Sequence, residues 1–158
     1  MSTDSYNYSL KLLAKRDYSK FKLRQKLASR FSDEEIEEAI ELLLEKNFLR
    51  EEEYARIRIK SLLISGNSNS LIKLKLENEE LKVSDDLINQ VKEDNGLGEA
   101  SSIEELIRKK MRHKEVPVCD NELLKLKHKL LNFLASKGHN LEESQEQIDK
   151  WLRTGECI

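Results

Sequence analysis

Residues 19–49 read SKFKLRQKLASRFSDEEIEEAIELLLEKNFL, and this stretch decides the fold of the chain. Leu23 and Leu27 lie four residues apart, so they share one face of a helix whose other faces carry lysine and arginine. The second half of the stretch repeats the apolar spacing, but its polar residues are mostly acidic. The stretch therefore predicts a basic and an acidic amphipathic helix in succession.

The turn between these two helices is also predicted. Ser32 and Glu35 have the spacing of a capping box, in which each side chain satisfies a backbone amide of the other residue. Phe31 and Ile36 flank the box at the spacing of a hydrophobic staple, which sets the angle between the helices. Asn47 can adopt the left-handed conformation past the end of the acidic helix. Two amphipathic helices of this kind need neighbours to cover their apolar faces.

The composition of the 158-residue chain favours an all-α protein. Hydrophobic residues make up 38% and charged residues 37%, and Pro117 is the single proline, which suits long helices with solvated faces. No run of about 18 apolar residues occurs, and the polar start MSTDSYNYS is not typical of a signal peptide. We therefore expect a cytoplasmic protein that does not enter a membrane.

The cysteines and histidines suggest neither a disulfide nor a metal site. Cys119 and Cys157 have no partner at metal-ligand spacing, and we expect both to be free thiols. A zinc site could in principle combine Cys119 with His113, His128 and His139, but no closely spaced ligand pair anchors it. We predict no cofactor and no metal.

The helical pattern recurs along the chain in step with its charge. Residues 1–31 carry eight basic and two acidic side chains, residues 32–53 carry two basic and ten acidic ones, and the alternation continues to the end. We therefore predict three tandem three-helix units, resembling helix-turn-helix repeats, at residues 1–49, 50–97 and 98–158.

The second unit is the least regular of the three. Its first helix should begin at the acidic run 51–53 and bury Tyr54, Ile57 and Ile64. Aligning the units at Phe31, Val83 and His139 assigns Leu74 and Asn78 to core-like positions, which is an unusual place for an asparagine. Two other residues offer a rival register. These are Ile72 and Leu76.

Several segments, in their order and spacing, resemble the RecX family of bacterial regulators of the RecA recombinase. The segments are LLAKR at 12–16, LRQKL at 23–27, DEEIE at 33–37, NFL at 47–49, EYA at 53–55 and LLNFLASKG at 130–138. The resemblance extends from about Tyr6 to Trp151. It departs from the family pattern in the first unit, which lacks one turn residue, at Asn78, and at His139, where an aromatic residue is expected.

The resemblance implies a fold and a function. The fold is three tandem three-helix units in an elongated, curved array. The function is to bind the groove of the RecA–single-stranded DNA filament and to suppress ATP hydrolysis, strand exchange and coprotease activity toward LexA-type repressors, in DNA repair and the SOS response. We expect a monomer whose partner is the RecA filament.

Three basic clusters are the candidate binding residues. A basic helix face alone usually faces solvent, but recurrence in three units favours a continuous binding stripe. We expect weak, salt-sensitive binding to single- and double-stranded DNA through phosphates, because the few aromatic residues occupy core-like positions. The candidates are Lys15, Arg16, Lys20, Lys22, Arg24, Lys26, Arg30, Arg56, Arg58, Lys60, Lys73, Lys75, Lys109, Lys110, Arg112, Lys125, Lys127 and Lys129.

Other functions fit the sequence less well. The acidic runs at 33–38 and 51–53 have no accompanying phosphate loop or nucleophile, so we predict that the protein is not an enzyme. The alternative is a helix-turn-helix transcription regulator, but the third helix of the first unit, where recognition would normally occur, is strongly acidic. A plain helical adaptor is a third possibility.

Overall fold

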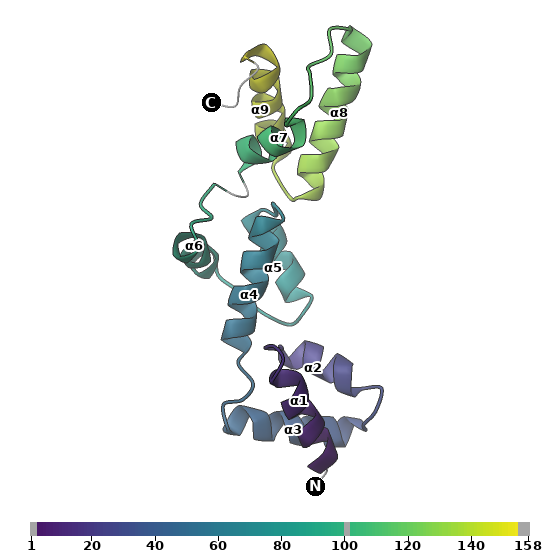
Figure 1. Ribbon diagram of the computed structural model, residues 1–158, viewed down its shortest axis with the longest axis vertical. Helices are drawn as coiled ribbons and strands as arrows, with labels where there is room; N and C mark the ends of the chain where they lie inside the picture. The colour runs from purple at the N-terminus through teal and green to yellow at the C-terminus, as the bar shows by residue number, and fades with distance from the viewer. Residues whose placement is uncertain (1–2, 100–101, 155–158) are drawn as a thin grey trace. The chain divides into compact units, whose positions relative to one another are not determined.

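The computed structural model describes residues 3–99 and 102–154, and these residues form nine α-helices and no strand (Figure 1). This confirms the all-α prediction. The helices are α1 (Thr3–Leu13), α2 (Lys20–Leu27), α3 (Asp33–Glu45), α4 (Glu51–Ile64), α5 (Asn69–Glu77), α6 (Asp85–Asp94), α7 (Ile103–Met111), α8 (Asp120–Ser136) and α9 (Leu141–Thr154).

The chain divides into two compact units. The first compact unit comprises Met1–Arg58 and Lys75–Ser84, and the second comprises Ile59–Leu74 and Asp85–Ile158. Helices α4 and α5 therefore contribute residues to both. The division into three three-helix units and their curved array stay predictions.

In the first compact unit, α1 packs against α2 and α3 around an apolar core. α1 approaches α3 through small polar residues, because Ser5 and Ser9 are its buried residues. The Ser5 hydroxyl donates to the Glu35 carbonyl at 3.1 Å, which ties the two helices together. The buried core consists of Tyr18, Leu23, Leu27, Ile36, Ile40, Leu43 and Leu49.

Serine side chains cap the starts of α3 and α7, and the cap of α3 is the one predicted from the sequence. The Ser32 hydroxyl accepts from the Glu35 amide at 3.3 Å, and the Ser32 amide donates to the Glu35 carboxylate at 2.9 Å, which is a complete capping box. Ser102 accepts from the amide of Glu105 at 3.2 Å and so caps α7. These local patterns define where α3 and α7 begin.

Several helices end in a left-handed residue. Asn47 (φ 59°) confirms the sequence prediction, and Gly138 (φ 80°) follows α8 in the same conformation. Glu80 (φ 60°) ends α5 in the same way, which the sequence did not suggest because glutamate rarely adopts this conformation. α7 ends at Met111, six residues before Pro117.

The buried face of α4 differs from the predicted one. Ile57 and Ile64 are 58% and 55% exposed, so their predicted burial is wrong. Apolar residues elsewhere around the helix form the buried side, because tertiary contacts select one of several apolar rows on a helix that is not strongly amphipathic. The buried residues are Ala55, Ile59, Leu62 and Leu63.

The rival register is the correct one in α5. Ile72 and Leu76 are fully buried, whereas Leu74 is 53% exposed and Asn78 also faces solvent. The left-handed turn at Glu80 explains the shift, because the amide of Leu81 donates back to the Leu76 carbonyl at 2.9 Å and closes the helix there.

In the second compact unit, α9 packs against both α7 and α8. The three helices meet through their apolar faces, and α8 contributes Leu130 and Leu134 to the buried core. The buried core consists of Ile103, Leu106, Ile107, Met111, Leu130, Leu134, Ile148 and Trp151.

Candidate functional site

Part of the candidate basic set is engaged in ion pairs within the protein. Such a cation is already neutralised locally, so a partner must compete with an internal carboxylate to bind it. The pairs are Lys22–Glu79 at 3.5 Å, Arg24–Glu37 at 2.6 Å, Arg56–Glu52 at 3.2 Å, Arg58–Glu79 at 3.4 Å, Lys73–Asp85 at 2.9 Å and Lys127–Asp149 at 2.5 Å.

Arg24 joins α2 to α3 through a two-point contact. Its Nε donates to one oxygen of the Glu37 carboxylate at 2.6 Å and its Nη2 donates to the other oxygen at 3.2 Å. This hydrogen bonding raises the pKa of the Arg24 guanidinium and lowers the pKa of the Glu37 carboxyl. Arg24 also lies 3.6 Å from a carboxylate oxygen of Glu80, so it faces two acidic residues.

Glu79 is the centre of a second polar cluster. Only 6% of this residue is exposed, and its carboxylate accepts from the Tyr54 hydroxyl at 2.9 Å and from Arg58 Nε at 3.4 Å. The Lys22 ammonium lies 3.5 Å from the same carboxylate. Burial, and then the hydrogen bond to Glu79, raise the pKa of Tyr54 to about 12. The cluster connects α2, α4 and the turn after α5 within the first compact unit.

Other candidate cations rest on aromatic rings. This contact keeps the charge while it fixes the side chain against the protein surface. The distances to the ring centroids are 4.9 Å for Arg16 over Tyr18, 4.7 Å for Arg30 over Tyr8 and 4.5 Å for Lys110 over Phe133.

A further set of candidates has no carboxylate within ion-pair distance among residues 3–99 and 102–154. We call these residues the open cations, and their ammonium or guanidinium groups can meet an external anion without breaking an internal pair. All are exposed except Lys20, which is half-exposed. The open cations are Lys15, Lys20, Lys26, Lys60, Lys109, Arg112, Lys125 and Lys129.

Half of the open cations belong to the α7–α8 region of the second compact unit. Lys109 and Arg112 lie at the end of α7, and Lys125 and Lys129 lie four residues apart on α8. The two helices are in contact, and Lys110 of α7 lies over a ring of α8. This region therefore presents several cations that have no carboxylate within ion-pair distance among the described residues. The continuous stripe through all three clusters stays a prediction, and Lys75 is an exposed member of its second cluster.

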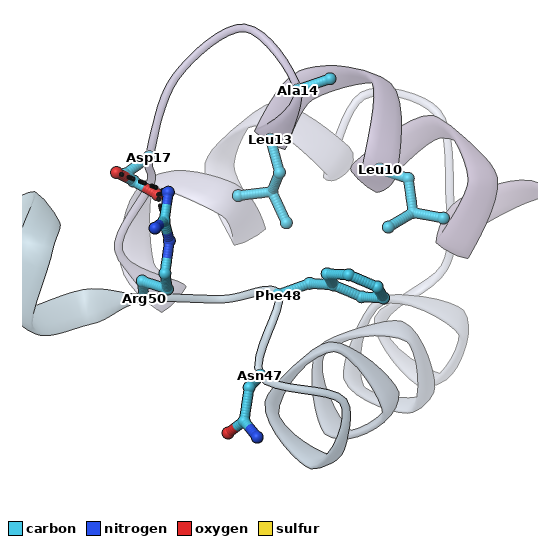
Figure 2. Close-up of a pocket in the computed structure, with 7 residues that line it drawn as sticks. All are labelled: Leu10, Leu13, Ala14, Asp17, Asn47, Phe48 and Arg50. Carbon is cyan, nitrogen blue, oxygen red and sulfur yellow. Dashed lines mark hydrogen bonds and ion pairs between the residues drawn. The ribbon is translucent and has the colours of Figure 1, made fainter.

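The first compact unit also contains a pocket that the sequence did not suggest (Figure 2). It has a volume of about 400 Å³, with the ring of Phe48, a residue that is 49% exposed, along one wall and the Asp17–Arg50 ion pair (3.1 Å) at one side. Apolar groups dominate its lining, and we assign it no chemistry. The lining residues are Leu10, Leu13, Ala14, Asp17, Asn47, Phe48 and Arg50.

The described residues hold no group of three histidine, cysteine, aspartate or glutamate side chains that could ligate one metal ion. Cys119 is a free, exposed thiol, and Cys157 lies outside the described residues. Within residues 3–99 and 102–154, the helices are all too short or too polar to span a bilayer.

Comparisons with known proteins agree on one family. The model of the first three-helix domain of RecX matches residues 6–43. The regulatory protein RecX of Haemophilus influenzae (strain PittEE) is 30% identical over 150 residues, which cover 94% of this chain and 95% of the relative. That of Actinobacillus pleuropneumoniae serotype 5b (strain L20) is 36% identical over 135 residues, covering 84% and 82%. No solved structure matches the chain significantly.

Proposed function

The chain belongs to the RecX family of regulatory proteins, and from this premise we propose that it regulates the RecA recombinase. It binds the groove of the RecA–single-stranded DNA filament and suppresses ATP hydrolysis, strand exchange and coprotease activity. The observation that carries the proposal is the similarity to regulatory protein RecX over 94% of the chain. DNA repair and the SOS response are the processes in which it acts.

The distribution of charge supports this mode of action. The open cations provide contacts to a phosphate-bearing partner, and those of α7 and α8 are grouped on neighbouring helices. The mechanism needs no cofactor, because a protein lodged between recombinase protomers restrains their movement sterically. Contacts to two protomers at once raise the effective concentration of the second contact, so individually weak contacts add to firm binding.

The test is a titration of this protein into a RecA ATPase assay on single-stranded DNA, with the recombinase of the same organism. We expect inhibition well below one molecule per RecA protomer, and we expect it to persist at moderate salt. A matched titration contains excess single-stranded DNA, which relieves inhibition that arises only from DNA sequestration.

Absence of inhibition at equimolar protein would contradict the proposal. If the same protein then protected a defined duplex sequence from nuclease cleavage, the helix-turn-helix regulator would replace it. If inhibition vanished with excess DNA, the protein would act on DNA and not on the filament.

A further inference from the structure

The turn after α8 and the turn after α5 each pack against another helix, the first through its backbone and the second through carboxylate side chains. In the second compact unit, the turn after α8 lies against the start of α5, where the amide of Ser68 donates to the Lys137 carbonyl at 2.8 Å. A β-carbon on Gly138 would lie 2.7 Å from the β-carbon of Leu71, so this contact is a close backbone approach. In the first compact unit, the turn after α5 approaches α2, but through the carboxylates of Glu79 and Glu80.

The cations that face this acidic turn are arranged like an anion site. Lys22 and Arg58 approach the Glu79 carboxylate at 3.5 Å and 3.4 Å, and the Tyr54 hydroxyl donates to it at 2.9 Å. Arg24 lies 3.6 Å from the Glu80 carboxylate, while its guanidinium also donates to Glu37 at 2.6 Å and 3.2 Å. Two guanidinium groups, an ammonium and a hydroxyl are a donor set that suits an anion with several oxygen atoms.

Glu80 adopts a backbone conformation that is unfavourable for glutamate. Its φ of 60° lies in the left-handed region, where a side chain is strained and where the turn after α8 has Gly138. The strained residue presents its carboxylate to Arg24. Strain of this kind points to a role for the side chain itself.

We propose that Lys22, Arg24 and Arg58 form a binding site for nucleic-acid phosphate, and that the Glu79–Glu80 turn occupies this site as an internal anion. The turn limits DNA binding until a phosphodiester backbone displaces it. The open cations Lys20 and Lys26 lie on the same helix as Lys22 and Arg24, so a bound strand would find further positive charge along α2. This inference rests on the proposed function, because the single-stranded DNA of the RecA filament is the nucleic acid that the site would meet.

The decisive variant is Glu80→Gly, because glycine accepts the left-handed backbone and the variant therefore folds. Its affinity for a fluorescently labelled oligothymidylate is measured by anisotropy with no recombinase present. We expect about 3- to 10-fold tighter binding at low salt, and a slope of log K against log salt steeper by about one, because Arg24 then faces one carboxylate, that of Glu37, in place of two. Thermal melting by circular dichroism confirms that the variant is folded.

The matched control is Glu77→Gln. It removes one negative charge from an exposed residue at the end of α5, three positions before Glu80. It should bind the oligonucleotide like the unchanged protein. Adding Arg24→Gln to Glu80→Gly should abolish the gain, which assigns the gain to this pair.

Equal affinity of Glu80→Gly and the unchanged protein would overturn the inference, as would an equal gain in Glu77→Gln. Neither result touches the proposed function, because RecA inhibition by the unchanged protein is measured separately. Conversely, a loss of RecA inhibition with a preserved gain in DNA affinity would leave the phosphate site in place and remove only the proposed function.

Discussion

Tyr54 is the residue in which the fold most clearly alters proton chemistry. The phenol donates to the buried Glu79 carboxylate at 2.9 Å, and a phenolate there would lose this bond and face a second negative charge. Burial adds to the effect, and the pKa rises from 10.0 to about 12. Because the folded state holds the proton more tightly than the unfolded state, this contribution to stability is complete below pH 10.

We expect the stabilisation from Tyr54 to be lost as the pH rises from 10 to about 12. Two pKa units correspond to about 2.7 kcal/mol, and partial solvent exposure of the side chain reduces this to about 1 kcal/mol. The measurement is the ultraviolet phenolate absorbance of the unchanged protein minus that of Tyr54→Phe. A difference curve centred near pH 10 would show that the hydrogen bond to Glu79 does not form.

Helix ends decide how neighbouring elements meet. Gly138 has a φ of 80°, and a β-carbon there would lie 2.5 Å from the Ser68 hydroxyl oxygen, so both the backbone and the space require glycine. Gly96 has a φ of 63° with open space around it, and Gly98 has neither constraint. An alanine would therefore meet both backbone strain and steric overlap at Gly138, backbone strain alone at Gly96, and neither at Gly98.

Alanine substitutions at these glycines should destabilise the protein in a fixed order. We expect Gly98→Ala to change the free energy of unfolding by less than about 0.5 kcal/mol, Gly96→Ala to cost about 1 kcal/mol and Gly138→Ala to cost about 2–4 kcal/mol. Urea denaturation followed by circular dichroism measures all three. A Gly138→Ala variant as stable as Gly98→Ala would mean that the turn after α8 does not pack against α5 as described.

At the scale of the whole molecule, the function depends on which cations remain available. The ion pairs of the two compact units occupy part of the basic set, and the open cations of α7 and α8 do not compete with an internal carboxylate in the described residues. Binding to the filament should therefore depend more on the open cations than on the paired cations, although the two groups look alike in the sequence.

Two triple variants of equal charge test this. Each loses one arginine and two lysines, and we expect the variant in open cations to weaken RecA ATPase inhibition about tenfold, whereas the variant in paired cations changes it less than about twofold. The dose–response of RecA ATPase inhibition measures both, and equal effects would show that pairing does not decide availability. The variants are Arg112→Gln/Lys125→Gln/Lys129→Gln and Arg56→Gln/Lys73→Gln/Lys127→Gln.

The helical class, the capping of α3 by Ser32 and the turn at Asn47 could be predicted from the sequence, because these depend on residues within a few positions of one another. The resemblance carried by its segments also determined the family. Only the tertiary structure decided the buried register of α5, where Ile72 competes with Leu74 for the core.

The tertiary structure also decided which cations are paired. Lys22 and Arg58 look like solvated basic residues in the sequence, yet both meet the carboxylate of Glu79. An ion pair between distant residues leaves no local pattern, because each partner alone is compatible with an exposed helix face. Local periodicity therefore determines helices and their ends, whereas packing between helices determines which charges remain for a partner.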